Sequence, residues 1–238
     1  MAEININELV ALAGYTQPKA NLMKVVIDCA VETLTYAEKE LEKNWAEFCG
    51  KKGALLKPHK KFPIRPNENA ITYELADYVD DYLKRLPMGH LYRGAIKFYN
   101  EKPKRSKKLA GSNRKRLDFR FEADFAGGPE LVIEAKPLFF EKEIKEKYYG
   151  ASGLGRFIRA VEPYSVDDLG GLLAYVRIDQ TKMWQDKILL KAESAEGFQS
   201  IRHLNIGKPL FVSYTTAHKR EVGIMPIWML HIILRYPH

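Results

Sequence analysis

The sequence reads Arg116-Leu-Asp-Phe-Arg-Phe-Glu-Ala-Asp-Phe-Ala-Gly-Gly-Pro-Glu-Leu-Val-Ile-Glu-Ala-Lys136 where two strand-like segments meet at a tight turn. In the first segment charged residues alternate with apolar ones, and a strand has a period of two. Asp118, Arg120, Glu122 and Asp124 therefore share one face. We predict a β-hairpin with one face in the core and a charged face that faces solvent or a reactive site.

The turn Ala126-Gly-Gly-Pro129 limits how the two strands can pair. A three-residue loop over its first three residues places a glycine at the left-handed position, whereas a loop shifted by one would require a positive φ at the proline. In this register Asp118 lies opposite Lys136 and Arg120 lies opposite Glu134. Asp118 and Glu134 are then diagonal neighbours, roughly 7 Å apart at the backbone.

Two carboxylates at this spacing can share a cation. Asp124 lies more than roughly 13 Å farther along the strand, so Asp118 is the better partner for Glu134. Oxygen ligands without histidine or cysteine favour Mg²⁺, with Mn²⁺ also suitable. Such an ion can polarise a phosphate oxygen and lower the pKa of a bound water. Lys136 is suited to orient that water or to stabilise a pentacovalent phosphate.

The pattern of Asp118 followed by Glu134-Ala135-Lys136 resembles the PD-(D/E)xK nuclease superfamily, which includes restriction endonucleases, Holliday-junction resolvases and phage-defence nucleases. The resemblance implies that Asp118, Glu134 and the backbone carbonyl of Ala135 bind a divalent metal and that Lys136 assists the nucleophile. It also implies a restriction-endonuclease-like mixed sheet flanked by helices. The proline often found before the first aspartate is replaced by Leu117.

Many members of that superfamily carry a further glutamate on the helix before the hairpin. The segment Glu68 to Leu75 is similar to that pattern. At 100° per residue Glu68 falls within an apolar stripe that includes Ile71, whereas Glu74 falls to the side of that stripe. Glu68 is therefore the further catalytic candidate, with Glu74 in reserve.

One stretch of the sequence is densely basic. The chain has a formal net charge of +8, and the run from Lys102 to Arg116 contains no acidic residue. We expect a mobile loop that neutralises phosphates of a nucleic acid, most readily DNA. The candidates for this contact are Lys104, Arg105, Lys107, Lys108, Arg114, Lys115, Arg116 and, in a glycine-rich segment interpreted as a flexible connector, Arg156.

The remaining pattern predicts an α/β protein. Apolar residues at helical spacing predict a long helix from Lys19 to Phe48, with room for one break, and a second helix from Asn67 to Leu86. The strands Gly171–Arg177, Leu210–Thr215 and Ile227–Arg235 and a helix over Met183–Glu193 follow. We expect a mixed sheet of at least four strands flanked by helices, with an N-terminal helical region (1–60) before the core (61–238).

The apolar face of the first long helix must be buried against that core or against a partner, so a protein partner or a homo-oligomer through this helix is an open possibility. The two cysteines form no metal-ligand or disulfide pattern, and no signal peptide or 18-residue apolar span is present. We therefore expect a cytoplasmic protein without a membrane segment.

These features predict a Mg²⁺-dependent DNA endonuclease, as in the effectors of defence or restriction systems. A nucleic-acid-binding module that does not cut, and a nuclease subunit active only within a complex, are the alternatives.

Overall fold

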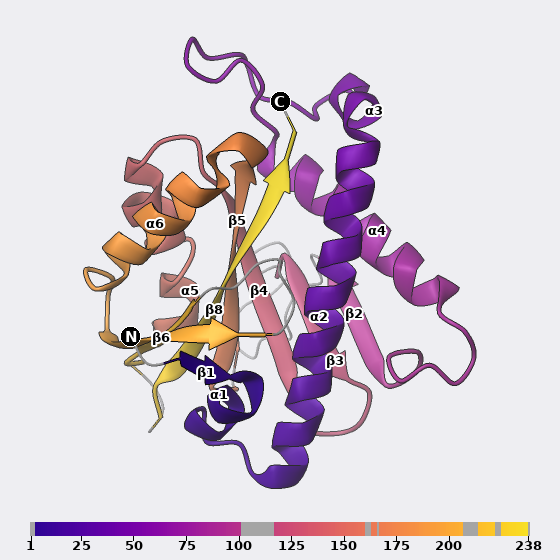
Figure 1. The fold of residues 1–238 in the computed structure, drawn as a ribbon, viewed down its shortest axis with the longest axis vertical. Helices are drawn as coiled ribbons and strands as arrows, with labels where there is room; N and C mark the ends of the chain where they lie inside the picture. Colours follow the sequence, from indigo (N-terminus) through magenta and orange to yellow (C-terminus); the bar gives the residue numbers. More distant parts are fainter. Residues whose placement is uncertain are drawn as a thin grey trace, which may run out of the picture.

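The computed structural model describes residues 3–100, 117–159, 163–165, 167–206, 214–221 and 225–237. Within them the centre of the molecule is an eight-stranded sheet in the order β1-β6-β7-β8-β5-β4-β3-β2 (Figure 1). The strands are β1 (Glu3–Asn5), β2 (Ile96–Asn100), β3 (Phe119–Ala123), β4 (Glu130–Pro137), β5 (Leu169–Arg177), β6 (Phe198–Asn205), β7 (Tyr214–His218) and β8 (Ile227–Tyr236). The central strands β4, β5 and β8 are parallel to one another, whereas β3 and β7 run antiparallel to their neighbours in this centre. The predicted α/β class with a mixed sheet and flanking helices is confirmed.

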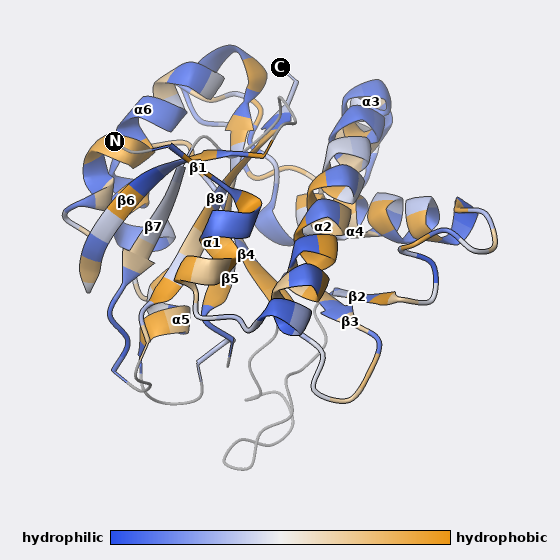
Figure 2. Ribbon diagram, turned by 60° about the horizontal axis from the view of Figure 1, so that its bottom comes forward, coloured by the Kyte–Doolittle hydropathy of each residue, from blue (hydrophilic) through white to orange (hydrophobic). Residues whose placement is uncertain are grey.

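Helices cover both faces of the sheet. The helices α1 (Ile6–Leu12), α2 (Gln17–Lys43), α3 (Trp45–Gly50) and α4 (Glu68–Arg85) contribute to one hydrophobic cluster. The helices α5 (Gly155–Ile158) and α6 (Thr181–Ala192), with a π-helical turn at Ile144–Tyr148, contribute to the other. Figure 2 shows the apolar residues gathered in the central strands between these two layers.

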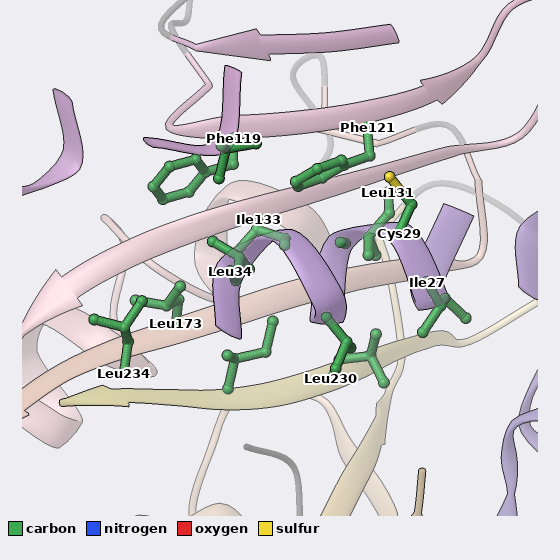
Figure 3. Close-up of a cluster of buried hydrophobic side chains, with 14 of the residues drawn as sticks. Ile27, Cys29, Leu34, Phe119, Phe121, Leu131, Ile133, Leu173, Leu230 and Leu234 are labelled. Carbon is green, nitrogen blue, oxygen red and sulfur yellow. The ribbon is translucent and has the colours of Figure 1, made fainter. Parts of the chain in front are cut away.

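The long first helix is present and has the break that the sequence allowed. It is interrupted at Asn44, which caps the end of α2 and the start of α3. Ile27, Cys29 and Leu34 on its inner face lie against side chains of the sheet such as Phe121 (Figure 3), and all four are fully buried. The apolar face of α2 is thus covered by this chain's own sheet, and residues 1–60 share a core with residues 61–238.

Helix α4 begins one residue after the predicted start and ends one residue before the predicted end. At the start of the helix, the Asn67 side chain accepts a hydrogen bond from the Asn69 amide. Lys84 and Arg85 occupy the last turn, where positive charge interacts favourably with the helix dipole. Helix α4 packs against α2, and the hydroxyl of Tyr82 donates to Glu32 across that contact. This packing fixes the first turn of α4, and with it Glu68, relative to the sheet.

The hairpin of β3 and β4 is present, but the predicted register is wrong by two residues. Phe119 pairs with Ile133, so continuing the ladder by one position places Asp118 opposite Glu134 instead of Lys136. The connection is longer than three residues and contains a four-residue turn with Gly127 at φ 77°, closed by a hydrogen bond from the Gly128 amide to the Phe125 carbonyl. A positive φ at the third position is typical of a type II turn. A shift of two keeps every side chain on its predicted face.

The later elements agree with the sequence in part. Strands β5 and β8 and helix α6 lie where they were predicted. The predicted strand Leu210–Thr215 corresponds to β7, with residues 210–213 outside the described part of the chain. The short elements β1, α1, β2 and β6 were not predicted. No helix in the described part of the chain is long and apolar enough to cross a membrane.

Candidate metal centre

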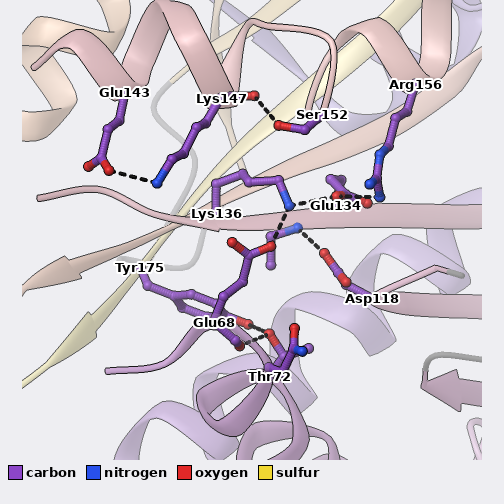
Figure 4. Close-up of polar contacts among 12 residues, drawn as sticks. Glu68, Thr72, Asp118, Glu134, Lys136, Glu143, Lys147, Ser152, Arg156 and Tyr175 are labelled. Carbon is purple, nitrogen blue, oxygen red and sulfur yellow. Dashed lines mark hydrogen bonds and ion pairs between the residues drawn. The ribbon is translucent and has the colours of Figure 1, made fainter. Parts of the chain in front are cut away.

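Three carboxylates from three different elements meet at one end of the hairpin (Figure 4). Glu68 comes from the first turn of α4, Asp118 directly precedes β3, and Glu134 lies in β4. One oxygen atom of each lies within 4.8 Å of the others. Glu68 and Glu134 are 66 positions apart in the sequence, so the group forms only because α4 and β3 pack against β4.

A backbone contact fixes Asp118. The Ala135 amide donates a hydrogen bond of 2.7 Å to Oδ2 of Asp118. The structure thus assigns the backbone N–H of Ala135 to this carboxylate, and the predicted role of its carbonyl as a metal ligand stays a prediction. A hydrogen bond to the charged form stabilises the carboxylate and opposes its protonation.

Lys136 lies between two of the carboxylates. Its ammonium nitrogen is 2.5 Å from Oε1 of Glu68 and 2.8 Å from Oε1 of Glu134, and only 5% of its side chain is exposed. Desolvation lowers the pKa of this lysine, but the attraction of Glu134, Glu68 and Asp118 outweighs it and the pKa is raised. Lys136 is therefore held as a cation.

Glu134 is the most deeply buried member of the group. Its side chain is inaccessible to solvent, and its Oε2 has no hydrogen-bond partner in the described part of the protein. Burial, with repulsion from Asp118, raises its pKa to about 8 against the attraction of Lys136 and Arg156. Burial also raises the pKa of Asp118 to about 6. A buried carboxylate oxygen without a partner is costly, so this atom fits the role of a ligand.

Arg156 belongs to the site. Its NH1 group donates to Oε1 of Glu134 at 2.8 Å and to the hydroxyl of Tyr164, and its guanidinium lies 5.0 Å from the centre of the Tyr164 ring. The glycine-rich segment that carries it is a packed turn and not the flexible connector expected. A Cβ on Gly150 or Gly153 would lie 2.1 Å from a backbone carbonyl oxygen, so both positions require glycine.

The fully ionised group carries a net negative charge. When ionised, Glu68, Asp118 and Glu134 carry three negative charges, and Lys136 and Arg156 carry two positive ones. In this ionised form the group has a net charge of −1, which attracts a cation, and hard oxygen donors suit Mg²⁺ or Mn²⁺. The ligand set therefore fits the ion expected from the sequence.

The reserve candidate Glu74 and the less favoured Asp124 both form ion pairs outside this group. Both oxygens of Glu74 accept from Lys51, at 2.8 and 2.7 Å, and one also accepts from Tyr78. Asp124 pairs with Lys97 near the other end of the hairpin. Glu68 and Asp118, and not these two, lie in the group.

Other candidates lie outside the described residues or escaped the sequence analysis. The basic run, with Lys104, Arg105, Lys107, Lys108, Arg114, Lys115 and Arg116, falls in residues 101–116, which the structure does not describe.

Thr72, which the sequence did not point to, supports Glu68. Its hydroxyl donates to the Glu68 carbonyl at 2.7 Å and lies 2.9 Å from the Tyr175 hydroxyl, which therefore donates to Thr72. Only the spacing of four residues between Glu68 and Thr72 could have suggested that contact.

The chain matches no family model, and no curated protein or solved structure matches it at a significant level.

Proposed function

We propose that this protein is a metal-dependent nuclease that hydrolyses phosphodiester bonds in nucleic acid, most readily in DNA. The observation that carries the proposal is the convergence of Glu68, Asp118 and Glu134 around the buried Lys136. A structural ion pair needs one carboxylate for each cation, whereas this group has an excess of carboxylate and an unpartnered buried oxygen.

Each residue has a distinct part in the proposed reaction. A bound Mg²⁺ or Mn²⁺ supplies polarisation of the phosphate and a lowered pKa of an attacking water. Glu68, Asp118 and Glu134 would hold that ion, and the Ala135 amide keeps Asp118 in position. Lys136 presents a desolvated positive charge, which stabilises developing negative charge more strongly than an exposed lysine could. Arg156 orients Glu134 and offers a second cation for the phosphate.

A nicking assay tests the proposal. Purified protein is incubated with supercoiled plasmid in Mg²⁺, in Mn²⁺ and in EDTA. We expect cleavage only with a metal, and a loss of about 100-fold or more for Glu134→Gln. Glu74→Gln removes a carboxylate from the same helix that bears Glu68 but lies outside the group, so it should cleave as wild type does. Cleavage in EDTA, or full activity of Glu134→Gln, would refute the proposal.

The bridging position of Lys136 favours a second candidate. A lysine that pairs two carboxylates can also take the place of a metal ion in a site that has lost its activity. In that case the protein binds nucleic acid without cutting it. Titration calorimetry with Mn²⁺ separates the nuclease from the inactive nucleic-acid-binding protein, because we expect only the nuclease to bind the ion.

A further inference from the structure

A basic hairpin projects from the protein just before α4. Leu55 and Pro66 form one bridge and His59 and Phe62 form another in the same register, which places Lys60 and Lys61 at a two-residue turn. Backbone hydrogen bonds join Leu56 to Arg65 at 2.8 Å and His59 to Phe62 at 2.9 and 3.1 Å. The three prolines of this segment indicate an irregular connector, but the segment forms a defined hairpin. We refer to residues 55–66 as the basic hairpin.

The charge of this element is one-sided. Residues 55–66 contain three lysines, one arginine, one histidine and no acidic residue. Lys57, Lys60 and Lys61 are exposed, and none of the three forms a salt bridge with an acidic side chain in the described part of the chain. Exposed cations without local counter-charges are the usual means of binding a phosphate backbone.

Aromatic contacts hold the hairpin beside the metal centre. The ring of Phe140 lies 5.1 Å from that of Phe62 and 5.1 Å from that of His59, both edge-on. The guanidinium of Arg65 donates to the Lys57 carbonyl at 2.6 Å and lies 5.7 Å from the centre of the Phe139 ring. Phe139 and Phe140 are the third and fourth residues after Lys136, so one strand end carries both the lysine of the site and the support of the hairpin.

The other end of the hairpin is joined to the site directly. Pro66 is two residues before Glu68, and the Asn67 amide donates to the Ala54 carbonyl at 2.8 Å, which closes the base of the hairpin. Lys61 and Glu68 are seven positions apart in the sequence, so the tip lies within roughly 25 Å of the carboxylates. In a duplex this distance covers about seven base-pair steps.

We propose that the basic hairpin binds the phosphate backbone of the nucleic acid a few nucleotides from the bond that is cleaved. This inference rests on the proposed function, because it names the element that positions the substrate of that site. The lysines supply charge that does not depend on sequence, and the aromatic anchor keeps them at a fixed distance from Glu68 and Lys136. The hairpin should therefore determine how tightly the substrate is held and where along it the metal centre lies.

The experiment measures binding apart from cleavage. Binding of a fluorescein-labelled 30-base-pair DNA duplex is followed by anisotropy in EDTA over a range of salt concentrations. The variant Lys57→Gln/Lys60→Gln/Lys61→Gln is compared with Lys39→Gln/Lys43→Gln/Lys182→Gln, which removes the same charge from exposed positions on α2 and α6. We expect the Kd of the hairpin variant to rise about tenfold or more at low salt. The slope of log affinity against log salt concentration should become less steep by about 2 to 3 for the hairpin variant. The control variant should have the slope of wild type.

The outcomes separate this inference from the proposed function. If wild type cleaves DNA with Mg²⁺ but the hairpin variant binds as tightly as the control, the hairpin has no such role and the nuclease assignment stands. If the hairpin variant binds weakly but wild type never cleaves, the hairpin assignment stands and the nuclease proposal fails. Absence of duplex binding by wild type overturns both. Melting temperatures of all variants check folding, and Lys60→Gln/Lys61→Gln, confined to the exposed turn, repeats the test if the triple variant unfolds.

Discussion

The ammonium nitrogen of Lys136 lies 2.5 Å from a carboxylate oxygen of Glu68, although 68 positions separate the two residues in the sequence. Lys136 also contacts Glu134, so it sits where a cation would lie between these ligands. The same side chain thus compensates charge in the metal-free protein and, under the proposed function, must share that space with a metal.

Removal of Lys136 should uncouple metal binding from cleavage. In Lys136→Met the competing ammonium is absent, so the Kd for Mn²⁺ measured by calorimetry should equal or fall below that of wild type, because the carboxylates lose their internal counter-ion. Plasmid cleavage should nevertheless fall by about 100-fold or more, since the positive charge at the phosphate is lost. A lysine that only supports the ligands would instead give weaker Mn²⁺ binding in this variant.

Glu68 should contribute to metal affinity, and Glu74, six residues farther along the same helix, should not. We expect Glu68→Gln to weaken Mn²⁺ binding by about tenfold or more, because a carboxylate ligand is replaced by a neutral amide. Glu74→Gln loses only its contacts with Lys51 and Tyr78. Equal Mn²⁺ affinities of the two variants would place Glu68 outside the ligand set.

The raised pKa values of Glu134 and Asp118 should make metal binding depend on pH. Metal binding requires both carboxyls deprotonated, and burial raises the pKa of Glu134 to about 8 and that of Asp118 to about 6. Affinity for Mn²⁺ should therefore rise as pH increases from about 6 to 8, with proton release seen as a dependence of the calorimetric heat on buffer ionisation. A Mn²⁺ affinity that is constant over this range would contradict the raised values.

The same shift should make the metal-free protein less stable as pH rises from about 4.5 to about 8. Between the ordinary glutamate pKa of 4.5 and about 8, the folded state holds a proton on Glu134 that the unfolded state has released, so stability falls as pH rises through this window. Glu134→Gln removes this dependence. Thermal unfolding in EDTA should show a flatter profile of melting temperature against pH for that variant than for wild type.

His218 should act in the opposite direction, on the acid side. It is fully buried, lies 2.8 Å from the Thr216 hydroxyl and 3.0 Å from the Glu196 carbonyl, and burial lowers its pKa to about 4. The unfolded state takes up the proton first as pH falls below 6.5, so between pH 6.5 and 5 His218 should cost wild type roughly 1 to 2 kcal/mol of unfolding free energy relative to a variant that lacks this histidine.

Urea denaturation at the two pH values measures this loss. His218→Gln should lose less unfolding free energy on acidification than wild type does. An equal change in unfolding free energy for wild type and His218→Gln between the two pH values would show that His218 does not titrate there.

The sequence predicted what depends on local periodicity. The alternation of Phe119 and Phe121 with charged residues assigned the faces of β3, and the helical stripe separated Glu68 from Glu74. The register was wrong because the loop length cannot be read from the glycines alone, and the error was harmless to the faces because it was an even number of residues. Arg156 reaches Glu134 across 22 residues through packing of the turn at Gly150 and Gly153, and no local pattern encodes such a contact.

The basic hairpin was missed for a related reason. Its prolines signal an irregular connection, whereas two bridges and side-chain contacts such as that with Phe140 give it a defined shape. Contacts between segments far apart in the sequence decide both cases.

By accepting the hydrogen bond from the Ala135 amide, the Asp118 carboxylate also satisfies a backbone donor at the end of the β3–β4 ladder. Where the ladder between β3 and β4 ends, a side chain takes the place of the backbone carbonyl that would otherwise receive this amide. Asp118→Ala would leave a buried donor unsatisfied, at a cost of about 1 to 3 kcal/mol, so that truncation confounds chemistry with folding. Asp118→Asn keeps an acceptor for the amide while discarding the charge, and is therefore the substitution that isolates what the charge does.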